Sequence, residues 1–160
     1  MDNLKKILEV LNDLIRINKD REAGYTKASR ELTPAEHNLR SAFERKALES
    51  RSNVMQLESM ADEIHHQLNP EEPIELEVNP GMTGRIYKMW TEVKDFFFGM
   101  DNSTILRSFV DGEEKAKTCY ENALNEVQMP EEICTLLNNQ KSSIDASQQE
   151  IKSLLNSEFK

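Results

Sequence analysis

Residues that interrupt helices are scarce in this sequence, which has five glycines and five prolines among 160 residues. Charged residues make up 31% of the chain, and this composition favours long helices joined by short connections. A chain of this length can bury a sizeable core without disulfides or metals to stabilise it. We therefore expect a single domain over residues 1–160.

Cysteine is also scarce, since Cys119 and Cys134 are the only two. Two cysteines cannot form the dense disulfide framework of a small secreted domain. We expect both to be free, buried thiols. They fall on neighbouring predicted helices at a similar height, so a redox pair is the alternative.

Basic residues and long apolar runs are lacking as well. Lysine and arginine number 20 against 29 aspartates and glutamates, which gives a formal net charge of −9. An acidic surface argues against nucleic acids and anionic membranes as the main partner. The sequence shows no signal-peptide pattern at its N-terminus and no apolar stretch that approaches a membrane span. We expect a cytoplasmic protein that binds neither nucleic acid nor membrane.

What the sequence does contain is helical periodicity of its apolar residues. This spacing predicts four long helices, over residues 2–31, 34–68, 102–127 and 130–158. Thr33 and Glu36 form a capping-box pattern at the start of the second helix, with Pro34 at its first position.

The lengths of the connections predict how these helices are arranged. Tight turns make helical hairpins of residues 2–69 and 102–158. Residues 70–101 form a long crossover, which contains a short amphipathic helix at about 82–98. One long crossover between two tight hairpins is typical of the ferritin-like topology. The sequence therefore predicts an all-α, ferritin-like four-helix bundle with a short extra helix.

Two glutamates occupy positions where the helical pattern predicts an apolar side chain: Glu22 and Glu113. A carboxylate that faces the core is costly unless it is paired, bound to a metal or protonated. In a tight hairpin, residues at equal distances from the turn lie at equal heights along the bundle. This places Glu44 and Asp145 at about the height of Glu22 and Glu113. Four carboxylates at one level of a bundle suggest a di-iron or di-manganese type of site.

The alternative is a buried polar layer without a metal. Carboxylate metal sites of this type need Glu-x-x-His on two of the helices, but Glu44 is followed by Ala47 and Asp145 by Gln148. The lack of histidine at this level favours the polar layer and no cofactor, and leaves iron or manganese at a degenerate site as the alternative. The expected members of the layer are Asn18, Tyr25, Tyr120, Gln140 and Gln148.

One literal Glu-x-x-His is present, from Glu63 to His66, in the last turns of the second predicted helix. Because Ile64 takes the core face there, we expect His65 to point outward. A histidine at a helix C-terminus interacts favourably with the helix dipole, so we interpret this pair of histidines as surface residues.

Several segments of the chain resemble a family of uncharacterised bacterial ferritin-like proteins, a domain of unknown function. The segments that carry the resemblance are 11–15, 19–25, 89–94, 112–114, 120–124 and 140–151. The resemblance implies a ferritin-like bundle and no established activity. Such proteins often have a histidine three residues before the isoleucine that matches Ile151, where this chain has Gln148.

These observations favour a non-enzymatic structural, interaction or stress-related protein, with a degenerate carboxylate metal protein as the alternative. A homodimer is one form that an interaction role could take, and any other protein partner is unknown. The apolar crossover helix supplies the candidate contact surface, formed by Trp90, Phe96 and Phe97.

Overall fold

The computed structural model describes residues 2–32, 37–68, 84–91 and 102–158. These residues form five helices: α1 (Asp2–Glu31), α2 (His37–Leu68), α3 (Arg85–Thr91), α4 (Asn102–Glu126) and α5 (Glu131–Glu158). The part of the chain that is described contains no strand, so the all-α prediction is confirmed there. None of the described helices is long and apolar enough to cross a membrane.

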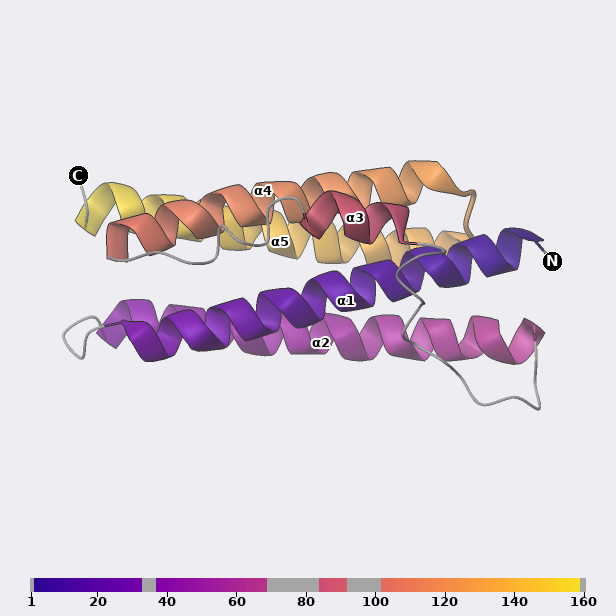
Figure 1. The fold of residues 1–160 in the computed structure, drawn as a ribbon, viewed down its shortest axis with the longest axis horizontal. Coiled ribbons are helices and arrows are strands. Elements are labelled where there is room, and N and C mark those ends of the chain that lie inside the picture. Colours follow the sequence, from indigo (N-terminus) through magenta and orange to yellow (C-terminus); the bar gives the residue numbers. More distant parts are fainter. Residues whose placement is uncertain (1, 33–36, 69–83, 92–101, 159–160) are drawn as a thin grey trace.

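The four long helices form two layers, one made by α1 and α2 and the other by α4 and α5 (Figure 1). Within each layer the two helices are antiparallel. Between the layers, α1 packs against α4 and α2 packs against α5. Figure 1 also shows that α2 and α4 run in the same direction.

The end of α2 and the start of α4 lie at opposite ends of the bundle (Figure 1). This separation of the two helix ends is what a crossover between two hairpins requires. The described part of this connection is α3, which packs on α1 and α4.

The observed ends of the long helices agree with the predicted ends to within a few residues. The short helix was predicted over 82–98 and is described only from Arg85 to Thr91. Phe96 and Phe97, two residues of the predicted interface, lie outside the described residues, as do Thr33, Pro34 and Glu36 of the predicted helix start.

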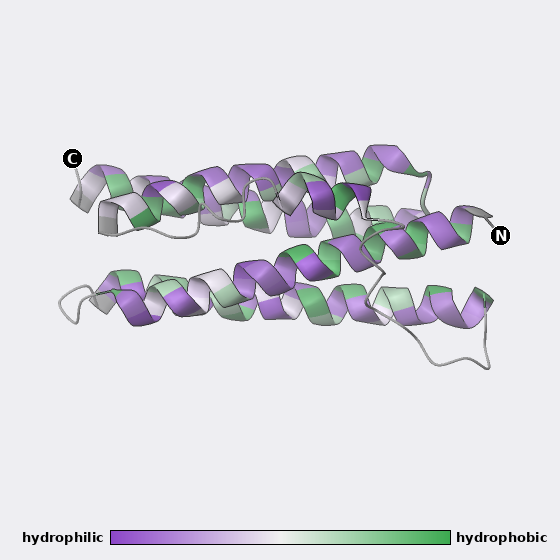
Figure 2. Cartoon of the chain, in the orientation of Figure 1, coloured by the Kyte–Doolittle hydropathy of each residue, from purple (hydrophilic) through white to green (hydrophobic). Residues whose placement is uncertain are grey.

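Hydrophobic and hydrophilic residues alternate along each long helix, so that none is hydrophobic all round (Figure 2). The apolar residues gather between the two layers. One end of this core holds an aromatic cluster in which the ring of Tyr25 stacks on Phe109 at 4.4 Å between centroids. Phe43 meets both rings, at 5.4 Å from Tyr25 and 5.0 Å from Phe109. These three side chains come from α1, α4 and α2, so the cluster joins both layers.

Helix α3 is held on α1 by polar contacts from residues on successive turns of α1. Asp20 accepts hydrogen bonds from the hydroxyl of Tyr87 at 2.8 Å and from the indole N–H of Trp90 at 3.0 Å. The guanidinium of Arg16 lies 3.7 Å from the centre of the Tyr87 ring, and Asp13 accepts the backbone N–H of Tyr87 at 3.4 Å. Trp90 is fully buried by its own chain, which leaves it no surface for a partner.

Asp13 is expected to make stability depend on pH. Burial raises its pKa to about 6, and the N–H of Tyr87 and the charge of Arg16 oppose this shift only in part. Because this pKa exceeds the unfolded value of about 3.9, the stabilising effect of the protonated form is complete below about pH 4. We expect the free energy of unfolding to fall by about 2 kcal/mol as the pH rises through 6.

Asp13→Asn should remove this dependence, because an amide does not ionise and still accepts the N–H of Tyr87. Urea unfolding followed from about pH 4 to 7.5 measures the difference. Asp111→Asn, at an exposed position of α4, is the matched control. Equal pH dependence in Asp13→Asn and the unchanged protein would contradict this assignment.

Candidate functional site

The centre of the bundle contains a buried ion pair between Arg21 of α1 and Glu113 of α4. The Nε of Arg21 donates to one oxygen of Glu113 at 2.8 Å, and a terminal nitrogen donates to the other oxygen at 2.7 Å. Arg21 is 1% exposed and Glu113 is 0% exposed. This two-bond geometry uses the planar fork of arginine against both carboxylate oxygens, and it gives the strongest form of such a pair.

Both side chains point inward because of their helical spacing. Arg21 lies three residues after Asn18 and four before Tyr25, and all three are buried on the same face of α1. Glu113 lies four residues after Phe109 and three before Ala116, which are also buried. Because α1 and α4 pack together, these two faces meet at the level of the ion pair.

A hydrogen-bonded network extends from Arg21 to the other helices. Asn18 accepts from Arg21 at 2.8 Å and donates to the hydroxyl of Tyr120 at 2.9 Å. Tyr120 in turn donates to Gln140 of α5 at 2.7 Å. Asn53 of α2 donates to the same oxygen of Asn18 at 3.2 Å. The network therefore includes side chains of all four long helices.

A second group of polar residues lies between α2 and α5, beside the ion pair. Lys46 pairs with Glu150 at 2.8 Å and donates to the carbonyl oxygen of Ser147 at 3.4 Å. Glu49 accepts a hydrogen bond from the hydroxyl of Ser143. The hydroxyls of Ser147 and Tyr25 lie 3.4 Å apart, which connects this group to α1.

The ionisation of these groups follows from their surroundings. Burial acts to raise the pKa of Glu113, but the charge and hydrogen bonds of Arg21 outweigh it and hold that pKa below its usual value. Burial raises the pKa of Glu49, and Arg21 and Lys46 offset this only in part. Burial also raises the pKa values of Tyr25 and Tyr120, so both hydroxyls stay protonated. The centre thus holds a charged pair together with protonated tyrosine hydroxyls and the side-chain amides of Asn18 and Gln140.

The four carboxylates of the predicted metal site do not come together. Glu113 is the only one of them in the interior. The side chain of Glu22 is 33% exposed and lies 4.0 Å from Arg51, and Glu44 is exposed on α2. Asp145 turns outward, where Lys117 pairs with it at 2.8 Å. Within the described ranges, no group of three or more His, Cys, Asp or Glu side chains is placed to hold a metal ion.

The five residues of the predicted polar layer are all buried. Asn18, Tyr25, Tyr120, Gln140 and Gln148 are each 3% exposed or less. Gln148 donates to the carbonyl oxygen of Val110 at 3.0 Å and to Glu114 at 3.1 Å. The layer therefore links α5 to α4 as well as to α1 and α2.

Sequence analysis missed several residues of this centre, among them Arg21, Glu49 and Asn53. The signal for Arg21 was its spacing from Asn18 and Tyr25, which fits a helical face as well as Glu22 does. Glu49 was missed because the pairing of α1 with α2 is displaced by about one turn from the reflected one. The contacts place Tyr25 beside Phe43 and Asn18 beside Asn53, whereas reflection placed Glu22 level with Glu44.

The structure also places the two histidines that were interpreted as surface residues and the two cysteines of the possible redox pair. His65 is buried at 9% exposure, so the expectation that it points outward is wrong, while His66 is exposed and lies 3.6 Å from Asp62. Neither Cys119 nor Cys134 forms a disulfide. The thiol of Cys119 faces the carbonyl oxygen of Ile86 at 3.7 Å and is fully buried, and Cys134 is half-buried. A redox link between the two stays a prediction.

Removing one partner of the central ion pair should strongly destabilise the protein. Arg21→Met leaves the carboxylate of Glu113 buried without its cation, and we expect it to cost about 3–5 kcal/mol in free energy of unfolding. Glu113→Gln should cost a similar amount because Arg21 is then unpaired. The double substitution Arg21→Met with Glu113→Leu should recover much of this loss, since no unpaired charge remains.

A double-mutant cycle in urea unfolding measures these differences. Arg51→Met is the control, because Arg51 is 67% exposed and should change stability by no more than about 0.5 kcal/mol. If Arg21→Met costs no more than Arg51→Met, the central pair does not have the role that its geometry indicates.

Comparison with protein families gives one match, and it covers most of the chain. The family described as Domain of unknown function (DUF2383) matches residues 6–126, which include most of α1, all of α2 and α3, and all of α4. A search of curated proteins found no match. The ion pair lies wholly inside the matched range, and Gln140, Ser147 and Gln148 of α5 lie beyond it. The expectation of a domain of unknown function is thereby confirmed, and the chain belongs to the DUF2383 family.

Proposed function

We propose that this protein is a ferritin-like bundle with a non-enzymatic structural or interaction role in the cytoplasm. The parallel direction of α2 and α4, with the end of α2 and the start of α4 at opposite ends of the bundle, supports the ferritin-like topology (Figure 1). The role is inferred from the centre of the bundle, where carboxylate metal proteins of this topology place their ligands.

The observation that carries the proposal is the guanidinium of Arg21 against Glu113. In a carboxylate metal site, metal cations balance the charge of the inward-facing glutamates. Here a cation of the chain itself does so, with both oxygens of Glu113 engaged at 2.7 and 2.8 Å. A metal would have to displace an arginine that is almost fully buried and also bound to Asn18.

The surrounding residues support a structural role in the same way. Asn18 donates to Tyr120, which donates to Gln140, so these hydrogen bonds join three helices. A network in which buried polar groups find partners holds helices in one arrangement and stabilises a unique core. It offers this protein a rigid support for surfaces that contact a second copy of the chain or another protein.

A metal-binding protein that uses Glu22, Glu44, Glu113 and Asp145 is the competing proposal. It requires Glu113 to release Arg21 and three outward carboxylates to turn inward. Iron or manganese are the metals that such a carboxylate site would take.

Elemental analysis separates the two proposals. Protein purified without chelator or affinity metal, from cells grown with added iron and manganese, should contain far less than one metal per chain. Chelator should leave its unfolding midpoint unchanged, because the ion pair needs no metal.

One or two metals per chain, lost in the double variant Glu22→Ala with Asp145→Ala, would overturn the structural proposal. Both positions are partly exposed, so this variant should fold. The same samples, examined by sedimentation at several concentrations, test the homodimer: a mass that stays at one chain throughout removes self-association from the proposed role.

A further inference from the structure

The short helix α3 depends on a small set of contacts with the rest of the bundle. It has seven residues, of which Ile86 and Trp90 are buried. Among the described helices it packs on α1 and α4 alone, away from α2 and α5 (Figure 1). A helix of this length is not stable by itself in water, so its contacts with α1 and α4 must hold it in place.

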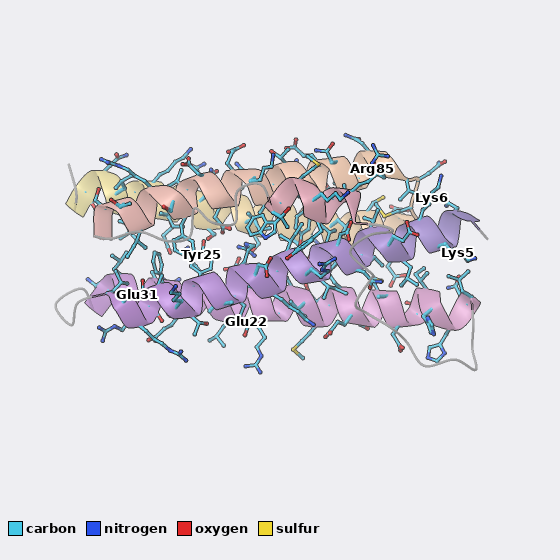
Figure 3. The ribbon with its side chains drawn as sticks, in the orientation of Figure 1. Lys5, Lys6, Glu22, Tyr25, Glu31 and Arg85 are labelled. Carbon is cyan, nitrogen blue, oxygen red and sulfur yellow. The ribbon has the colours of Figure 1, made fainter. Side chains whose placement is uncertain are left out.

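The contacts that hold α3 lie apart from the central ion pair. Asp20 accepts hydrogen bonds from Tyr87 and Trp90, and Asp13 accepts the backbone N–H of Tyr87. Arg85, at the start of α3, lies toward the end of the bundle where α1 begins (Figure 3). The central network is built from side chains of α1, α2, α4 and α5, so these helices can keep their arrangement when α3 leaves.

A thiol lies beneath α3. Cys119 of α4 is 0% exposed, and its Sγ faces the carbonyl oxygen of Ile86 at 3.7 Å. Because Ile86 belongs to α3, displacement of this helix uncovers the sulfur atom. Cys134 of α5 is half-buried and is not covered in the same way, so the two cysteines should differ in how they respond to α3.

We propose that α3 is a strap that detaches from α1 and α4 while the four long helices remain folded, and that its detachment exposes the thiol of Cys119. Local openings of this kind need less free energy than unfolding of the whole chain, and they involve elements with few buried apolar contacts. With the strap in place the thiol is sheltered from reagents in water, and with the strap detached it is accessible to them. The reactivity of Cys119 therefore depends on the position of α3.

Asp13 lies among charged groups of α1, α3 and α4, beneath the first residues of the strap. It is 2% exposed, and a Cβ added at Gly84 would lie 3.5 Å from its Oδ1. Arg85 and Glu126, which face this region from α3 and α4, pair with each other at 3.0 Å. The remaining charged groups around Asp13 are Lys6, Glu9 and Arg16 of α1.

The burial of Asp13 makes detachment of the strap depend on pH. Burial raises the pKa of Asp13 to about 6, with a smaller contribution from Glu9, while Arg16 and the N–H groups of Tyr87 and Ile86 oppose the shift. In the detached state this carboxyl faces water, where its pKa is about 3.9. Attachment is therefore strongest at low pH and weakens as the pH rises through 6. The equilibrium constant for detachment should rise about tenfold from pH 5 to pH 7.5.

Alkylation of the full chain by iodoacetamide, quantified at each cysteine by mass spectrometry, tests the strap. We expect the rate at Cys119 to stay nearly constant in low urea, because detachment of seven residues exposes little surface. A rate that rises with the urea dependence of whole-chain unfolding would overturn the proposal.

Asp20→Ala removes the acceptor that Tyr87 and Trp90 share. We expect alkylation of Cys119 to become about tenfold faster or more, because two hydrogen bonds to a charged group are lost, while the rate at Cys134 stays the same. Asp111→Ala, at an exposed position of α4, is the matched control. Equal rates at Cys119 in Asp20→Ala and Asp111→Ala would contradict the strap.

The pH dependence is tested by comparing the unchanged protein with Asp13→Asn. The ratio of their rates at Cys119 should rise about tenfold from pH 5 to pH 7.5, and taking this ratio at each pH cancels the ionisation of the thiol itself. A ratio that stays constant would remove Asp13 from the control of the strap.

Exchange of the indole N–H of Trp90 with solvent deuterium, followed by NMR, gives a second readout. Trp90 is the only tryptophan, so its indole signal is unambiguous, and this N–H is bound to Asp20 while α3 is attached. Both methods should give the same equilibrium constant for opening. A tenfold difference would show that another motion uncovers Cys119. None of these results bears on the central ion pair, which the metal analysis and the unfolding cycle test separately.

Discussion

The pairing of Arg21 with Glu113 is the interaction on which the centre of this bundle depends. Either charge alone would be too costly to bury, so each requires the other at the same height and in the right orientation. The two residues are on different layers, and only one alignment of α1 against α4 brings them together. We infer that the pair contributes more to the uniqueness of the packing than to net stability, as buried polar groups do in some helical assemblies.

The network around this pair extends the same constraint to the remaining helices. Asn18 connects Arg21 to Tyr120 of α4 and Asn53 of α2, and Gln140 adds α5. The aromatic cluster of Tyr25, Phe43 and Phe109 packs next to this network. Ring packing depends less strictly on orientation than a hydrogen bond does. Apolar packing therefore supplies burial, and the polar network selects the height at which the layers meet.

At the surface of the bundle, the short helix α3 is also positioned by hydrogen bonds to carboxylates. Asp20 holds Tyr87 and Trp90, and Asp13 holds the first turn of α3 while keeping one oxygen unpartnered. The central carboxylate of Glu113 has both oxygens bound by Arg21, whereas the buried carboxylate of Asp13 does not. This contrast separates a carboxylate whose charge is balanced by an arginine from one whose pKa is raised by burial.

By itself the sequence determined the helices, their hairpins and the burial of polar residues such as Asn18 and Tyr120, because helical periodicity depends only on local spacing. It could not decide between Arg21 and Glu22, which are adjacent on the helix and differ in direction by less than a third of a turn. Tertiary structure decided this, because only the approach of Glu113 from α4 makes burial of an arginine favourable. The same holds for Asp13, whose burial arises from the position of α3 rather than from any pattern in α1.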